Sequence, residues 1–241
     1  MGRFFGELYL RSTIPFLPED VTVAECQYLS SIFREPTVPD GPVLDLGCGH
    51  GRHLNLVDRL LDRAVVGIDY DALSLQAAHP GSRVRGDFFR LPFKDAAFGG
   101  AFCWYNTAFT FEDPQQLPLF CEFARVMKPG AVLVLQTAPV ERIRTLGDSR
   151  WEGDLPDGSH LVETCHFDPL KERDEGHRTL TLPDGRTMAA AYFIRYYSRP
   201  ALSALLETAG FRVSFWHAGV DGRAATNEST DLVVGAIRGD S

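Results

Sequence analysis

Apolar positions along this chain change between two spacings, and the change predicts the order of its elements. Short apolar runs, typical of strands buried on both faces, occupy residues 43–46, 64–68, 98–104 and 131–136, and a further strand is expected at 83–86. Apolar side chains at helical spacing occupy residues 21–33, 52–61, 72–78 and 114–127. Strands that alternate with helices in this way predict a parallel sheet with helices on both faces.

Between residues 145 and 197 apolar and polar positions alternate instead, which is typical of antiparallel strands. We expect strands at 159–167, 179–182 and 187–196, then a helix at 198–209 and strands at 211–216 and 231–237. Because the earlier rhythm returns, we interpret 145–197 as an inserted β-meander that covers the substrate. The prediction is one α/β domain over 1–241, a Rossmann-like doubly wound sheet of about seven strands, with residues 1–41 as an N-terminal lid and helix.

A glycine-rich segment follows the first predicted strand, where residues 43–51 read VLDLGCGHG. Glycine adopts positive φ and lets a ligand approach the backbone, so Gly47, Gly49 and Gly51 predict a turn bent around a ligand. A dinucleotide-binding turn has the spacing G-x-G-x-x-G. Here the third glycine comes one residue early, and Asp45 precedes the first by two.

The segment from Asp45 to Gly51 closely resembles the first motif of the class I S-adenosylmethionine-dependent methyltransferases. The resemblance is strongest over residues 43–136, and its Trp104–Thr107 segment is similar to that of a bacterial small-molecule branch. It implies that the sheet is mostly parallel with an antiparallel last strand, and that the glycine loop wraps the methionine part of the cofactor. It also implies that Asp69 binds the ribose hydroxyls, and that Asp87 with Phe88 binds the adenine.

Other residues near the loop are further candidates for cofactor contact. They are Cys48, Arg52, Tyr70, Trp104 and Tyr9. A solvated helix face is an equal alternative for Arg52. Tyr9 belongs to a leader that contains Phe4, Phe5 and Arg11 and that either covers the cofactor or only packs on the core.

Methyl transfer from a sulfonium depends mainly on alignment and on the exclusion of water, and it needs no metal. A general base is required only where the accepting atom must lose a proton. Our catalytic candidates are Tyr105, His166, Arg195 and Tyr196, with His160, His177 and Tyr197 considered beside them. Arginine at position 195 suits a carboxylate on the acceptor.

Charge and cysteine content limit the kinds of substrate and the cellular compartment that we expect for this chain. The chain has 24 Lys and Arg against 32 Asp and Glu, a net charge of −8, which disfavours a nucleic-acid substrate. Five scattered cysteines without a C-x-x-C pair fit a reducing cytoplasm better than a disulfide framework or a zinc site. No apolar stretch is long enough to span a membrane. We expect a monomer or homodimer that acts on a small molecule.

Three functions remain open at this point. The first is methyl transfer from S-adenosyl-L-methionine to an O or N atom of a small acceptor, which yields S-adenosyl-L-homocysteine. The second is a nicotinamide-dependent oxidoreductase, which would share Asp69 but leave Asp87 and Phe88 unexplained. The third is a protein that binds S-adenosylmethionine without catalysis.

Overall fold

The computed structural model describes residues 4–77 and 82–240, and its main element is a seven-stranded sheet with the order β10-β11-β5-β4-β1-β2-β3. Strand β11 runs antiparallel to both of its neighbours, and the other pairs are parallel. This confirms the Rossmann-like prediction with its antiparallel last strand. The strands are β1 (Val43–Leu46), β2 (Val65–Asp69), β3 (Ser82–Arg85), β4 (Phe98–Cys103), β5 (Met127–Thr137), β10 (Phe211–His217) and β11 (Leu232–Arg238).

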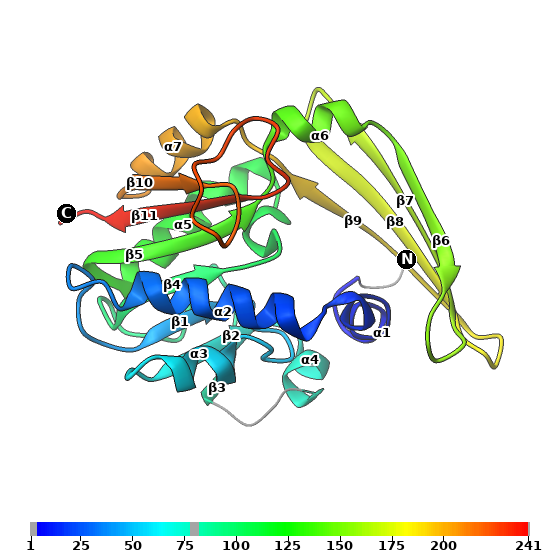
Figure 1. Ribbon diagram of the computed structural model, residues 1–241, viewed down its shortest axis with the longest axis horizontal. Coiled ribbons are helices and arrows are strands. Elements are labelled where there is room, and N and C mark those ends of the chain that lie inside the picture. The colour runs from blue at the N-terminus through cyan, green and yellow to red at the C-terminus, as the bar shows by residue number, and fades with distance from the viewer. Residues whose placement is uncertain (1–3, 78–81, 241) are drawn as a thin grey trace.

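Helices cover both faces of this sheet (Figure 1). Helices α2 (Glu19–Phe33) and α3 (Leu54–Leu60) pack on one face, and α5 (Asp113–Val126) and α7 (Arg199–Thr208) pack on the other. Strand β5 shows the cause. Its Val132 and Val134 side chains pack with residues of α2 and α3 on one face of the sheet. Its Leu133 and Leu135 side chains pack with residues of α5 and α7 on the other face. Both faces of a strand are therefore apolar, as the sequence pattern indicated.

The inserted region forms a separate antiparallel sheet of four strands with the order β6-β7-β8-β9. They are β6 (Ser149–Asp154), β7 (His160–Asp168), β8 (Arg173–Thr181) and β9 (Thr187–Arg195). The β-meander is confirmed, but β6 was missed and β8 begins six residues before the expected position 179. Residues 173–178 read RDEGHR, so nothing apolar marks them, and only pairing with both neighbouring strands makes them a strand.

Two more helices were not expected: α1 (Glu7–Thr13) and α6 (Val140–Leu146). In Figure 1, α1 lies between the N-terminal end of α2 and the four-stranded sheet. Helix α4 is Ala72–Ala77, so the end of the predicted helix 72–78 and the turn His79-Pro80-Gly81 lie outside the described residues. Among the described residues, no helix is long and apolar enough to cross a membrane.

Candidate active site

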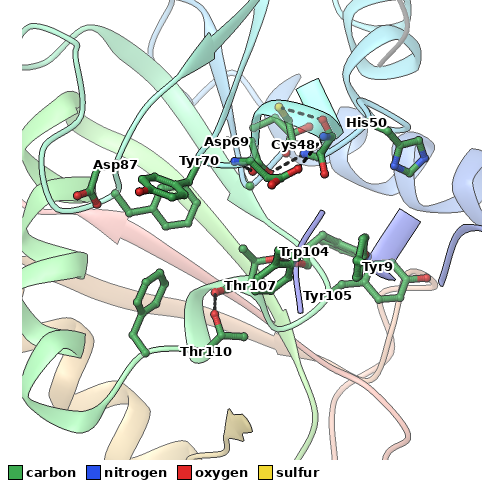
Figure 2. Close-up of a pocket in the computed structure, with 18 of the residues that line it drawn as sticks. Tyr9, Cys48, His50, Asp69, Tyr70, Asp87, Trp104, Tyr105, Thr107 and Thr110 are labelled. Carbon is green, nitrogen blue, oxygen red and sulfur yellow. Dashed lines mark hydrogen bonds between the residues drawn. The ribbon is translucent and has the colours of Figure 1, made fainter. Parts of the chain in front are cut away.

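A cavity of about 590 Å³ opens beyond the carboxyl ends of β1, β2 and β4. In Figure 2, Asp87 and Tyr70 lie toward one end of it, and Tyr9 and Tyr105 lie toward the other. The structure brings most of the predicted cofactor residues to its wall: Tyr9, Asp45, Gly47, Cys48, Gly49, Arg52, Asp69, Tyr70, Asp87, Phe88 and Trp104. Gly51 does not line the cavity; its N–H donates to the Cys48 carbonyl at 2.8 Å and closes the turn.

The glycine loop forms the floor of the cavity. Gly47, Gly49 and Gly51 all have positive φ, at 79°, 52° and 78°. A Cβ atom on Gly47 would lie only 2.5 Å from Thr107 Cγ2, whereas a Cβ atom on Gly49 would meet nothing within 4 Å. The loop therefore needs glycine at 47 for packing and conformation, and at Gly49 it leaves space open to a ligand.

Asp69 ends β2 and is held by the backbone. Its Oδ2 accepts from the Gly49 N–H at 2.9 Å, and its Oδ1 accepts from the Asp71 N–H at 2.7 Å. Burial raises the pKa of Asp69 against the effect of these hydrogen bonds. A carboxylate can accept about four hydrogen bonds, so Asp69 keeps capacity for the hydroxyls of a ribose.

An aromatic slot lies beside Asp87. The rings of Phe89 and Phe111 meet edge to face at 5.2 Å, and Phe88 packs 6.1 Å from Phe111. Asp87 is exposed, and its Oδ1 accepts from the Phe89 N–H at 3.0 Å. The slot offers apolar faces and a hydrogen-bond acceptor, which are what a flat heteroaromatic ring with an amino group requires.

Glu25, on α2, organises the opposite wall, and the sequence analysis missed it. Its Oε1 accepts from Trp104 Nε1 at 2.9 Å, and its Oε2 accepts from His53 Nε2 at 2.9 Å and pairs with Arg52 at 2.6 Å. All three partners line the cavity. A carboxylate among the buried positions Cys26 and Leu29 of an amphipathic helix was the available signal.

The protonation states of this cluster follow from its contacts. Burial disfavours the charge on Glu25, but hydrogen bonds from His53 and Arg52 outweigh it and hold the pKa of Glu25 below its usual value. Burial also lowers the pKa of His53 to about 4. Near neutral pH the cluster is therefore a Glu25–Arg52 ion pair with a neutral His53 that donates to the carboxylate.

One basic and one acidic side chain, Arg52 and Asp45, face the cavity with unused buried atoms. Arg52 directs one nitrogen to Glu25 and Thr22, and its guanidinium lies 4.6 Å from the centre of the Tyr105 ring. Its other terminal nitrogen, NH2, is buried and makes no hydrogen bond within the described residues, and the same holds for Oδ2 of Asp45. Buried polar atoms are normally paired, so these two atoms are available to bind the carboxylate and the ammonium group of a zwitterionic ligand.

Tyr105 stands where β4 leaves the sheet. Tyr105 and Asn106 are consecutive non-glycine residues with positive φ, at 52° and 56°. Such strain persists only where the surroundings hold it, and it is concentrated at functional sites. Burial, together with the nearby charge of Glu25, raises the pKa of Tyr105 to about 12, so this hydroxyl stays protonated near neutral pH.

Three of the four catalytic candidates lie away from the cavity. His166 is exposed on β7 and pairs with Asp148 at 2.7 Å. Arg195 pairs with Asp113 at 3.0 Å and lines a separate pocket of about 190 Å³. Tyr196 is buried and donates to Asp174 at 3.2 Å. These side chains are not placed to touch a ligand in the cavity, and Tyr105 is the candidate that remains there.

Strand alternation explains why the inserted histidines lie outside. Leu161 and Leu180, on β7 and β8, are buried beneath α1, so the side chains one residue away point to the other face of the sheet. His160, His166 and His177 all belong to that outer set. Tyr197 packs instead against Phe109 at 6.1 Å, in the core.

Comparison with known proteins agrees with this geometry. Residues 43–130 match the family model of a methyltransferase domain. A 24-methylenesterol C-methyltransferase 2 from Arabidopsis thaliana is 29% identical over 161 residues, which cover 56% of this chain and 44% of that protein. The chain spans less than half the length of the curated relatives that it matches.

Solved structures match over nearly the whole chain. The CcbJ methyltransferase from Streptomyces caelestis has a TM-score of 0.80 at 21% identity and covers 97% of this chain and 96% of its own. The sugar N-methyltransferase KedS8 from Streptoalloteichus has a TM-score of 0.72 at 16% identity, with 100% and 96% covered. At these identities the likeness concerns the fold. Residues 43–130 therefore match a methyltransferase domain, and the whole chain shares the fold of these solved methyltransferases.

Proposed function

We propose that this protein transfers the methyl group of S-adenosyl-L-methionine to an O or N atom of a small molecule. The observation that carries the proposal is the pair of orphaned atoms on Arg52 and Asp45 beside an open glycine loop. The cofactor supplies an electrophilic methyl group on a good leaving group. The protein's part is to bind, to align and to keep water away.

Arg52 and Asp45 hold the two ends of an amino-acid moiety. The unused nitrogen of Arg52 suits its carboxylate, and Oδ2 of Asp45 suits its ammonium group. Asp69 accepts from the ribose hydroxyls, and Asp87 with the aromatic slot receives the adenine. These assignments place the two ends of the cofactor at opposite ends of the cavity.

The acceptor is expected near Tyr105, on the side of the cavity that Tyr9 and Trp104 also line. Since the Tyr105 hydroxyl keeps its proton, it orients the acceptor by hydrogen bonding and does not act as a base. An amine that is already neutral needs no base before attack. Relatives named as sugar N-methyltransferase and sterol C-methyltransferase span different accepting atoms. We retain O or N for this chain, acting in the cytoplasm as a monomer or homodimer.

Calorimetric titration tests the cofactor assignment. We expect S-adenosylhomocysteine to bind and NAD not to bind, and we expect Asp69→Asn to weaken binding by about 1.5–3 kcal/mol, since charged hydrogen bonds to the ligand are lost. Asp62→Asn, at an exposed position, is the matched control. Binding of NAD alone would favour the oxidoreductase, and unchanged affinity in Asp69→Asn would remove Asp69 from the site.

Turnover is a separate question from binding. Incubation with cofactor carrying a radiolabelled methyl group and with fractionated small-molecule pools should label an amine or a hydroxyl compound. Labelling on carbon would refute the O or N assignment. Tight binding of the cofactor with no labelled product in any pool would favour the non-catalytic binding protein.

A further inference from the structure

Helix α1 separates the cavity from the inserted sheet, and its two faces serve different neighbours. Tyr9, together with Phe5 just before the helix, lines the cavity. Leu8, on the other face, is buried in a cluster with Leu161 and Leu180 of the inserted sheet. Helix α1 therefore contacts both the inserted sheet and the cofactor cavity.

A polar cluster fastens the end of α1 to the sheet. One nitrogen of Arg178, on β8, donates to Ser12 Oγ at 3.0 Å and to Thr13 Oγ1 at 2.7 Å. The same guanidinium pairs with Glu163 at 2.6 Å, and both side chains are largely buried. A buried guanidinium needs hydrogen-bond acceptors, and Arg178 finds them on both α1 and β7, so its side chain links the two elements.

The start of α1 is held as well. The Phe4 ring lies 4.2 Å from the Tyr192 ring and 5.1 Å from the Arg178 guanidinium. On the cofactor side, Gly6 has a φ of 109°, and a Cβ atom there would lie 3.2 Å from Asp71 Oδ2. Helix α1 and the residues before it thus contact the inserted sheet on one side and the loop after β2 on the other.

The strand register of the inserted sheet brings together the residues that contact α1. Glu163 and Arg178 lie directly opposite each other, and Tyr192 lies opposite Gly176. A Cβ atom on Gly176 would overlap the Tyr192 ring. The missing side chain lets the ring cross β8, so that the Tyr192 hydroxyl donates to Glu163 at 2.6 Å.

We propose that the inserted sheet holds α1 closed over the cofactor, with Arg178 as the positioning residue that couples them. Removal of the Arg178 hydrogen bonds frees the helix that carries Tyr9. Bound S-adenosylhomocysteine then dissociates faster, although no residue that touches it has changed. The inference rests on the proposed function, because it assumes that the cavity under α1 holds the cofactor.

The test compares Arg178→Met with Thr13→Val, which keeps the shape of the side chain and removes only the hydroxyl acceptor on α1. The dissociation rate of S-adenosylhomocysteine, followed by tryptophan fluorescence, should rise about tenfold in Arg178→Met and less in Thr13→Val. Hydrogen exchange of residues 7–13 should speed up in both. Since both changes cut one link, the double variant should equal Arg178→Met alone.

Arg186→Met is the matched control, because Arg186 lies in the exposed turn of the same hairpin and pairs there with Asp184. Arg178→Lys should recover part of the slow dissociation. If Arg178→Met fails to fold, Thr13→Val decides. Wild-type dissociation rates and wild-type exchange of residues 7–13 in the variants would overturn the coupling. Failure of the wild-type protein to bind S-adenosylhomocysteine would refute the proposed function itself.

Discussion

Glu25 shows how much a single side chain decides in this site. One buried carboxylate receives hydrogen bonds from Trp104, His53 and Arg52, which come from β4's exit and from the segment before α3. A buried charge is tolerated only when it is fully paired, so these three side chains and Glu25 fix one another. The nitrogen of Arg52 left over by this arrangement is the one that we assign to the cofactor carboxylate.

Glu25→Gln should therefore affect both folding and binding. The substitution keeps the shape of the side chain but leaves the Arg52 charge unpaired, which costs about 3 kcal/mol of unfolding free energy. Denaturant unfolding measures the loss, and titration with S-adenosylhomocysteine should show weaker binding. Glu19→Gln, on the exposed start of the same helix, should change neither. Equal stability of the two variants would contradict the assigned role of Glu25.

At the scale of elements, the β1–α3 loop combines a strained backbone with an open space. Gly49→Ala places a methyl group, at a φ of 52°, where no atom of the described residues lies within 4 Å apart from its immediate chain neighbours. We expect an unfolding penalty of about 1–2 kcal/mol for the left-handed conformation, and in addition at least a tenfold loss of S-adenosylhomocysteine affinity, since the methyl group enters the ligand's space.

Gly185→Ala is the control for this loop. Gly185 has a φ of 83° in the exposed β8–β9 turn, and a Cβ atom there also meets nothing within 4 Å. It should carry a comparable unfolding penalty and leave ligand affinity unchanged. If both variants bind the ligand as the wild type does, Gly49 is not in contact with it.

The inserted sheet shows the limit of pattern reading at the same scale. Alternation predicted β7 and β9 well, yet it did not say which of the two faces turns toward the core. Burial of Leu8 against Leu161 and Leu180 decides this, and it sends the histidines outward. Choosing catalytic candidates by residue type alone therefore selected the outer face.

At the scale of the whole molecule, two buried groups set opposing pH dependences of stability. Burial, with the nearby charge of Asp69, raises the pKa of Asp45 to about 8, so above pH 4 the folded state binds a proton that the unfolded state has lost. Stability then falls as pH rises toward 8. The lowered pKa of His53, about 4, acts in the opposite sense and only below pH 6.5, where the unfolded state becomes protonated.

The two effects oppose each other between about pH 4.5 and 6.5, and above this range the raised pKa of Asp45 makes stability fall. We expect the unfolding free energy of the ligand-free protein to fall by up to about 2 kcal/mol from pH 6.5 to 8, at about 1.36 kcal/mol per pH unit. Denaturant titrations across this range measure it. Asp45→Asn should remove the fall. A fall of the same size in Asp45→Asn would assign it to other groups.

The sequence predicted residues that line the cavity better among its cofactor candidates than among its catalytic candidates. Asp45, Asp69 and Asp87 lie near or just after the carboxyl ends of strands that meet at one edge of a parallel sheet, so local pattern was enough to bring them together. Glu25 and Arg178 escaped prediction because each acts on residues distant in the chain: Glu25 on Trp104, and Arg178 on Thr13. A charged residue in an amphipathic element does not show its partner.

By itself, the sequence determined the alternating strands and helices of the seven-stranded sheet, the glycine loop and the acids at the strand ends, because these depend on local periodicity and on the conformational freedom of glycine. Only the tertiary structure decided that α1 lies between the inserted sheet and the cavity, that Glu25 aligns Arg52 and Trp104, and that the histidines of β7 and β8 face outward. These outcomes depend on which surfaces pack together, and packing between distant segments is set by burial and by paired charges that no local pattern contains.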